Sequence, residues 1–425
     1  MADEEMADEE MADEEMADEE QQKDNQHSLV SVQQEHHEMK VQAEGSSLDI
    51  ISSLPTTIID TILCLLPIKD AVRTSKLSRD WRYNWVTIPK LVFDWGDMLG
   101  KTSHGILDAI HQVLLLHRGP ILEFELSMRN VENKSNAIDQ IISHLVRNNN
   151  TLKKFTLDLM ESGFHTDFPL YEFPLSIFSL HQLTDLYVKN CTFDYNPTIS
   201  GFRSLTSLYL ETNNMINLSK KALLHFFSHC PLLKRLELVL GDEGIDEAIT
   251  IMDIPKCLPV IEHLSFYRWT VESSAQNSVG RKLPMALVHL KYFCLNMMKL
   301  FDDDGLRFLG LVMRNSPNLE KIKLDIVDDG FDEDDIKLDT LKHCGDIWFE
   351  HLKELEIVDF SNAEGEMEFV ELILAKSPVL ENVIIVAHKY DVTEDEKLEI
   401  SKTLLQSKRA SPSANIIVER CSLCY

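Results

Sequence analysis

The closest pair of cysteines is the first candidate for chemistry. Cys421 and Cys424 have the C-x-x-C spacing found in thiol redox sites and in half of many zinc sites. A structural zinc ion needs four ligands, and no second cysteine pair or histidine pair lies near this one in the sequence. The other cysteines are scattered, which indicates free thiols in a reducing compartment rather than a disulfide framework. We therefore predict no metal site and no cofactor here.

An acidic run is the second candidate. The segment Asp328–Asp335 is mostly carboxylates, which are the oxygen ligands that Ca²⁺ prefers. A calcium loop that started at Asp325 would place Val327 and Ile336 at ligand positions 3 and 12, and neither side chain has an oxygen. We expect a solvated acidic loop that could attract a basic partner.

Motifs that mark other enzymes are missing from the sequence. It has no G-x-x-x-x-G-K-[ST] phosphate loop, no G-x-G-x-x-G, no G-x-S-x-G and no H-E-x-x-H. Its 16 histidines are dispersed. These observations predict a protein that is not an enzyme.

Length and charge narrow the remaining classes. The 425 residues suffice for two or three domains or for one long repeat array, and a hydrophobic share of 44% supports a real core. A net charge of -29 would repel a nucleic-acid backbone. No apolar run is long enough to span a membrane, and the first 20 residues are acidic, unlike a signal peptide. We expect an intracellular protein of the nucleus, the cytoplasm or both, without membrane or nucleic-acid partners.

The first 47 residues have the composition of a disordered segment. Residues 1–20 are four copies of Met-Ala-Asp-Glu-Glu, which repel one another and have almost nothing to bury. Residues 21–47 are rich in Gln, His and Ser. We interpret 1–47 as an acidic repeat tail followed by a linker.

The apolar pattern changes at Leu48 and predicts three short helices. Pro55 suits the first turn of the first helix and Pro67 ends it. A second helix begins near Asp70, and Ser78 can cap a third that carries two tryptophans one turn apart. Such a small bundle cannot hide all of its apolar side chains. The surplus must be covered by the rest of the chain or by a partner.

This stretch resembles the F-box, in its plant-type form. The matching residues, in order, are Leu54-Pro55, Ile62-Leu63, Leu66-Pro67, Lys69-Asp70, Thr74-Ser75, Leu77-Ser78 and Trp81-Arg82, closing on Trp85. Thr56 and Thr57 stand where the family usually has acids, and Asp80 stands where it usually has a base. These departures change polar positions and leave the apolar ones in place. We assign residues 48–90 to the F-box.

The middle of the chain repeats one pattern, apolar-x-x-apolar-x-apolar, at intervals of 22 to 33 residues. The ten copies begin at Ile121, Leu152, Leu183, Leu205, Leu233, Ile261, Leu290, Leu319, Leu352 and Leu380. Two copies continue to Cys191 and Asn213, as leucine-rich repeats do, and we interpret both residues as structural. In each copy alternate residues of a short strand point into the core and the others point outward.

Helical stripes separate these strands, for example Ile138, Ile141, Ile142 and Leu145. Proline two residues before a copy, as at Pro317 and Pro378, ends the preceding helix. Strand and helix alternating with a constant hand predict a curved leucine-rich-repeat solenoid over residues 91–340.

Residues 341–420 resemble the FBD domain, which follows the repeats in a large plant family of F-box proteins. The matching features are His351-Leu352-Lys353-Glu354-Leu355, Ser377-Pro378, Leu404-Leu405, Arg409-Ala410-Ser411-Pro412 and Ile416-Ile417-Val418. The plain alternative is the last two repeats followed by a capping helix and strand, and the two interpretations are compatible. The expected fold is therefore α/β: a small all-α three-helix F-box, then the solenoid with a C-terminal FBD cap.

The resemblance implies the substrate-recognition subunit of an SCF-type (Skp1-cullin-F-box) E3 ubiquitin ligase. Its F-box would bind a Skp1-like adaptor, and through it a cullin, while the repeats would bind an unknown target protein. The expected adaptor-binding residues are Leu54, Pro55, Ile58, Ile59, Ile62, Leu66, Pro67, Val72, Leu77, Trp81 and Trp85, the last four of them partly as bundle core. The expected target-binding residues, which are outward strand positions, are Tyr187, Lys189, Tyr209, Glu211, Glu237, Tyr267, Asn296, Lys323 and Asp325.

A rival function belongs to another class. The chain could be a leucine-rich-repeat scaffold or inhibitor that binds a protein and recruits no ligase. Residues 48–86 would then only cap the solenoid. Capture of a Skp1-like adaptor distinguishes the two functions.

Overall fold

A computed structural model describes residues 51, 53–94, 96, 103–129, 135–148, 151–160, 171–192, 202–212, 220–240, 253–267, 286–298, 303–327, 348–388 and 392–420. The predicted acidic tail and linker, Asn213, the acidic run and the C-x-x-C pair lie outside the described residues. The chain divides into two compact units, Met1–Ile59 and Asp60–Tyr425.

Short helices open the described part of the chain. They are α2 (Thr56–Cys64), α3 (Ile68–Arg73) and the 3₁₀ helices η1 (Thr74–Lys76) and η2 (Asp80–Thr87). The Pro67 carbonyl accepts hydrogen bonds from the N–H groups of Asp70 and Ala71, so the proline that ends α2 also starts α3. The predicted second helix thus begins two residues earlier than expected.

The third predicted helix is η2, and it is a 3₁₀ helix rather than an α-helix. Its N-cap residue is Arg79, which makes no side-chain cap, one residue later than the predicted cap Ser78. The Ser78 Oγ nevertheless accepts a hydrogen bond from the Trp81 N–H at 3.3 Å. The Ser75 hydroxyl donates a hydrogen bond to the Arg82 carbonyl at 3.0 Å. In an α-helix that carbonyl would accept from the N–H of the residue four positions later.

In the described part of the chain, twelve parallel strands form one sheet and follow one another in chain order. They are β1 (Lys90–Phe93), β2 (Glu123–Arg129), β3 (Lys154–Met160), β5 (Asp185–Lys189), β7 (Ser207–Thr212), β8 (Arg235–Leu240), β9 (His263–Tyr267), β10 (Tyr292–Met298), β11 (Lys321–Ile326), β12 (Glu354–Phe360), β13 (Asn382–Ala387) and β14 (Asn415–Arg420). A separate pair joins β4 (Tyr171–Glu172) to β6 (Cys191–Thr192). Each of the ten repeat copies begins two residues before one of these strands.

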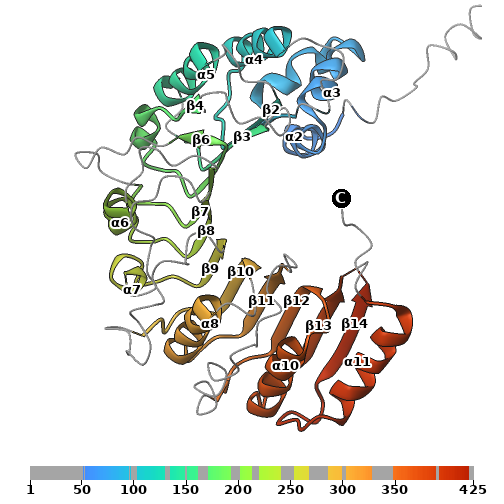
Figure 1. Cartoon of the computed structure of the whole chain (residues 1–425). Coiled ribbons are helices and arrows are strands. Elements are labelled where there is room, and N and C mark those ends of the chain that lie inside the picture. Colours follow the sequence, from blue (N-terminus) through green and yellow to red (C-terminus); the bar gives the residue numbers. More distant parts are fainter. Residues whose placement is uncertain are drawn as a thin grey trace, which may run out of the picture. The chain divides into compact units, whose positions relative to one another are not determined.

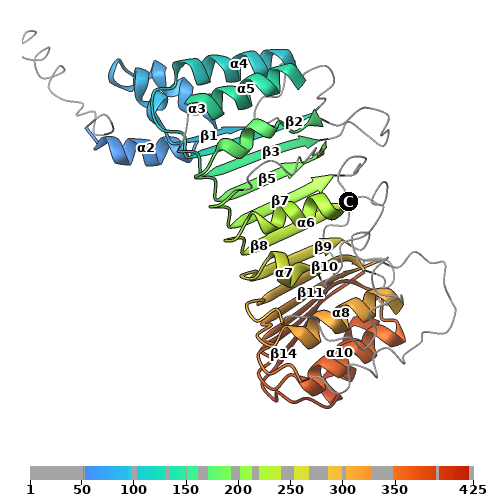
Figure 2. The same ribbon diagram turned by 90° about the vertical axis from the view of Figure 1, so that its left-hand side faces the viewer.

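The described helices that follow β1 lie along one side of the sheet (Figures 1 and 2). They are α4 (Ser103–Leu116), α5 (Ser135–Asn148), α6 (Lys220–Ser228), α7 (Ile254–Cys257), α8 (Asp303–Asn315), α10 (Glu364–Lys376) and α11 (Glu394–Gln406), with the 3₁₀ helix η4 (Leu175–Ser179). Among the elements that the structure describes, none covers the opposite side, which we call the open face. The predicted repeat solenoid is therefore confirmed, with α11 and β14 as the expected capping helix and strand.

The core lies between the sheet and these helices. Inward strand residues such as Leu186, Val188 and Leu210 are buried, as are the predicted helical stripes on α5 and α10. Phenylalanines extend this core through neighbouring repeats. The Phe155 ring lies 5.9 Å from the Phe124 ring and 6.1 Å from the Phe173 ring, measured between centroids. Inward positions in register thus supply the contacts that hold one repeat to the next.

Candidate functional sites on the amino-terminal helices and the open face

α2 carries two apolar stripes where a helix packed on one core needs only one. Ile59 and Leu63 are buried, with 5% and 0% of their surface exposed. Ile58 and Ile62 have the same spacing one residue earlier, and Leu65 follows in the turn just after the helix; their exposed fractions are 46%, 37% and 81%. The first stripe belongs to the core, and the second remains in contact with water.

The predicted adaptor-binding residues divide into three classes of exposure. Five are exposed, namely Pro55, Ile58, Ile62, Leu66 and Leu77. Three are partly exposed, namely Leu54, Pro67 and Val72. Three are buried, namely Ile59, Trp81 and Trp85, and these support the helices from inside. Adaptor binding itself stays a prediction for all eleven.

Sequence reasoning left out three exposed apolar side chains in the same segment. They are Ile51, Leu65 and Tyr83. The spacing of Leu65 from Ile58 and Ile62 could have identified it, because positions i, i+4 and i+7 continue one helical face, here one residue past the end of α2. Nothing in the local pattern distinguishes Tyr83 from a core aromatic residue.

Burial makes the described thiols poor nucleophiles. Burial raises the pKa of Cys230 to about 12 and raises the pKa values of Cys64, Cys191 and Cys294 as well. These thiols are therefore protonated near neutral pH. Within the described ranges, no three histidine, cysteine or acidic side chains gather as metal ligands do, and no helix has the length and apolar character to cross a bilayer.

On the open face, outward residues form rows that cross the strands. One row runs in register through Tyr187, Tyr209, Glu237, Ser265, Cys294, Lys323 and Glu356. The rings of Tyr187 and Tyr209 stack in this row with their centroids 4.1 Å apart. The Tyr209 hydroxyl donates a hydrogen bond to Glu211. This row places aromatic rings beside charged groups.

Ion pairs join many of the outward charges. Lys189 lies 3.1 Å from Glu211. Lys321 lies 2.7 Å and Lys323 lies 2.6 Å from the Glu356 carboxylate. Burial acts to raise the pKa of Glu356, but the two lysine hydrogen bonds outweigh it and hold that pKa below its usual value. These charges already have partners within the sheet.

All nine predicted target-binding residues lie on the open face with intermediate exposure. Six of them have internal partners: Tyr187, Tyr209, Lys189, Glu211, Lys323 and Asn296. The other three, Glu237, Tyr267 and Asp325, make no hydrogen bond or ion pair with any described residue. Burial and Asp359 raise the pKa of Asp325 to about 6. A role in target binding stays a prediction for all nine residues.

Two outward positions are more buried than alternation predicts. Ser265 and Cys294 are 7% and 4% exposed. The Asn296 side chain covers them, since its amide donates to the Ser265 hydroxyl at 3.2 Å and its carbonyl oxygen lies 3.4 Å from the Cys294 sulfur. Asn296, expected to contact a target, is thus engaged inside the sheet.

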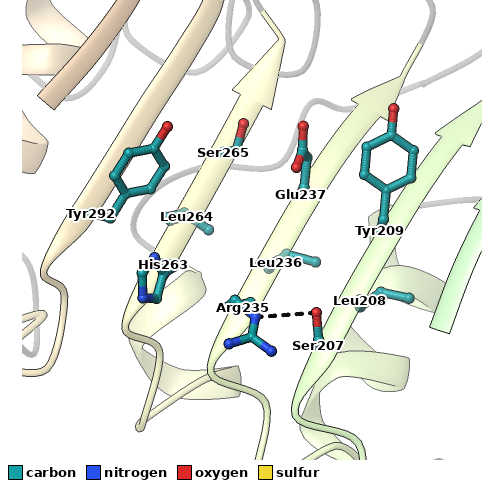
Figure 3. Close-up of a pocket in the computed structure, with 10 residues that line it drawn as sticks. All are labelled: Ser207, Leu208, Tyr209, Arg235, Leu236, Glu237, His263, Leu264, Ser265 and Tyr292. Atoms are coloured by element: carbon teal, nitrogen blue, oxygen red, sulfur yellow. Dashed lines mark hydrogen bonds between the residues drawn. The ribbon is translucent and has the colours of Figure 1, made fainter. Parts of the chain in front are cut away.

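A depression of about 170 Å³ hollows the middle of the open face (Figure 3). Its polar lining residues are Ser207, Tyr209, Arg235, Glu237, His263, Ser265 and Tyr292. Arg235 points toward Ser207, while Glu237 stands between Tyr209 and Ser265. Arg235, His263 and Tyr292 were not among the predicted residues, although alternation places the first residue of each strand outward too.

The turn after β5 holds a residue that sequence reasoning missed. Asn190 has a positive φ of 55°, and its side-chain amide donates a hydrogen bond to the Leu159 carbonyl of the preceding repeat at 2.9 Å. Cys191, which we interpret as structural, is fully buried beside it. The adjacent asparagine therefore makes the polar contact between repeats, and the cysteine contributes to the core.

Three family models match the chain in order. The F-box domain matches residues 51–90, the domain described as "At1g61320/AtMIF1, LRR domain" matches 114–279, and FBD matches 350–385. These ranges overlap the three regions predicted from the sequence.

Relatives in Arabidopsis thaliana share these parts. F-box/FBD/LRR-repeat protein At1g13570 is 29% identical over 432 residues, which cover 88% of this chain and 99% of that protein. FBD-associated F-box protein At5g56370 is 31% identical over 250 residues, which cover 59% of this chain and 54% of that protein. Among solved structures, the leucine-rich repeat-containing protein LegL7 from Legionella pneumophila is similar, with a TM-score of 0.37 and 13% identity over 75% of this chain and 89% of that one.

Proposed function

Because this chain belongs to the F-box/FBD/LRR-repeat protein family, we propose that it is the substrate-recognition subunit of an SCF-type E3 ubiquitin ligase. Its F-box binds a Skp1-like adaptor, and through it a cullin, and its repeats bind the target protein. The subunit performs no chemistry of its own. It holds lysines of the target close to a ubiquitin-loaded enzyme and so raises their effective concentration.

One observation carries this proposal: apolar side chains on and just after α2 are exposed to water. Leu65 is 81% exposed and Ile62 is 37% exposed. Covering a fully exposed aliphatic side chain with a partner stabilises a complex by roughly 1.5–3 kcal/mol. A few such side chains, surrounded by contacts that exclude water, are enough for a tight interface.

The buried residues favour part of the rival function. Trp81, Trp85 and Val86 are buried, and the Val86 carbonyl accepts a hydrogen bond from the Arg118 N–H at 2.8 Å. These contacts tie the segment to the start of the sheet, as a solenoid cap requires. A cap alone, however, gives no reason for Leu65 to be 81% exposed. We therefore prefer a segment that caps the sheet with one side and binds an adaptor with the other.

Capture of the adaptor by the full chain tests the proposal. A purified Skp1-like adaptor should bind the wild-type chain, and the double substitution Ile62→Ala with Leu66→Ala should weaken binding by about a hundredfold, since two apolar contacts are lost. Leu115→Ala with Leu116→Ala on α4 is the matched control, because those leucines are 75% and 56% exposed outside the F-box. Equal affinity of the two double variants, or no capture by wild type, would contradict the ligase role.

A further inference from the structure

Glu237 is a half-buried carboxylate on the open face without a partner among the described residues. Other carboxylates on the same face do have ion-pair partners. Glu211 has Lys189 at 3.1 Å, Asp185 has Arg235 at 3.6 Å, and Glu356 has two lysines. Burial and the charge of Glu211 raise the pKa of the Glu237 carboxyl, because nothing compensates its own charge.

Tyrosine side chains lie near this carboxylate. In the register, Tyr209 lies directly opposite Glu237 on β7 and Ser265 lies opposite it on β9. Tyr292 lines the same depression. Tyr267 is also close, since the charges of Glu211, Asp325 and Glu237 add to burial in raising the pKa of its hydroxyl. Tyrosine faces beside a carboxylate are the setting in which proteins bind cations.

The depression also has the room for a side chain. Its volume of about 170 Å³ is far above the ~10–15 Å³ that one water molecule needs. Arg235 does not fill the acidic end, because its guanidinium is held by Ser207 at 3.4 Å and by Asp185 (Figure 3). Burial and Arg235 lower the pKa of His263, so this imidazole is neutral near neutral pH. The uncompensated charge of the depression is therefore negative.

We propose that the depression at Glu237 is a recognition site for a single lysine or arginine side chain of the target protein. The cation would pair with the Glu237 carboxylate and lie against the ring of Tyr209, its neighbour on β7. A metal ion is a poor alternative, because in the described part of the chain no group of three metal-ligating side chains includes Glu237. This inference rests on the proposed function in one respect, namely that the ligand belongs to a target protein.

Degenerate peptide pools are suitable probes. In each pool one position is fixed as Lys, Arg, Gln or Glu, and retention of the purified full chain is measured on each. Wild type should be retained about tenfold better by the Lys and Arg pools than by the Gln pool, which is the worth of one charge-assisted contact. Glu237→Gln should reduce this preference to less than about twofold, and Glu237→Lys should shift it toward the Glu pool.

Glu125→Gln is the matched control. Glu125 is also outward and partly exposed, and it makes no ion pair with a described residue, but it lies on β2 outside the depression. It should keep the wild-type preference. Equal retention of wild type by all four pools, or an unchanged preference in Glu237→Gln, would overturn the inference.

Adaptor capture, measured on the same preparations, separates this failure from failure of the proposed function. If wild type captures the adaptor and shows no preference for cations, the recognition site alone is overturned. If the cation preference depends on Glu237 and the adaptor is not captured, the site stands and the ligase role fails.

Discussion

The amino-terminal helices and the open face of the sheet expose different chemistry. Between Asp60 and Thr87 the exposed large hydrophobic side chains are Ile62, Leu65, Leu66, Leu77 and Tyr83. On β5 to β12 the outward side chains are mainly tyrosines and charges, and most of these charges are paired with one another. The helices leave apolar surface without a partner, whereas the sheet largely satisfies its own polar groups.

Under the proposed function, this difference suits the amino-terminal helices to tight binding and the open face to selective binding. Burial of apolar surface is strong and non-directional, which suits one shared adaptor. Charged and polar groups on an interface mainly determine which partner is accepted, because a wrong partner leaves them unpaired. The open face therefore suits discrimination among targets, and Glu237 is one of the described positions where its own pairing is incomplete.

The largest expected effect contrasts a buried ring with an exposed aliphatic chain. Phe155→Ala should reduce the free energy of unfolding by about 3–5 kcal/mol, because Phe155 is 1% exposed and packs between two other rings. Leu65→Ala should change it by less than about 0.5 kcal/mol, because Leu65 is 81% exposed. Urea denaturation followed by circular dichroism measures both. A large loss of stability in Leu65→Ala would remove the contrast, since that side chain would then belong to the core.

A buried carboxylate should make the free energy of unfolding depend on pH, with an effect of intermediate size. Glu366 is fully buried, and burial raises its pKa from 4.5 to about 7 although it accepts hydrogen bonds from the N–H groups of Ser361 and Ala363. The folded chain thus binds this proton more tightly than the unfolded chain. Stability should fall by about 1–3 kcal/mol as the pH rises from about 4.5 to about 7, and stay level above that.

Glu366→Gln should remove that slope from the free energy of unfolding measured at several pH values. Glu364→Gln, two residues earlier on α10 and exposed, should retain it. A slope that persists in Glu366→Gln would mean that other groups of the folded chain cause it.

Periodicity predicted the solenoid because its strands repeat a single pattern. All ten copies of the pattern lie two residues before a strand. The same pattern, Ile88-x-x-Leu91-x-Phe93, also begins two residues before β1, although it is not among the ten predicted copies. The 3₁₀ geometry of η2 could not be predicted, because two tryptophans four residues apart fit an α-helix as well as an irregular turn.

The sequence of a single strand could not predict which outward charged groups form salt bridges with each other. A salt bridge such as that of Lys189 with Glu211 depends on the register between neighbouring strands and on the side-chain rotamers. The repeat pattern aligns the strands, but it does not say that Glu237 faces a tyrosine and a serine rather than a lysine. The exposed stripe of α2, by contrast, follows from helical spacing once its buried counterpart is known.

The smallest expected effect tests whether the paired charges of the open face matter for stability. Lys321 lies 2.6 Å from Glu354 and 2.7 Å from Glu356, and its ammonium is 5.8 Å from the centre of the Tyr292 ring. About a third of the side chain is exposed, so solvent screens these contacts, and Lys323 still pairs with Glu356 after Lys321→Met. We expect a loss of at most about 1 kcal/mol in the free energy of unfolding, shrinking further in 0.5 M salt because mobile ions screen the pair. A larger loss, insensitive to salt, would show that the ion pairs are structural and that the open face is less free for selectivity than its exposure indicates.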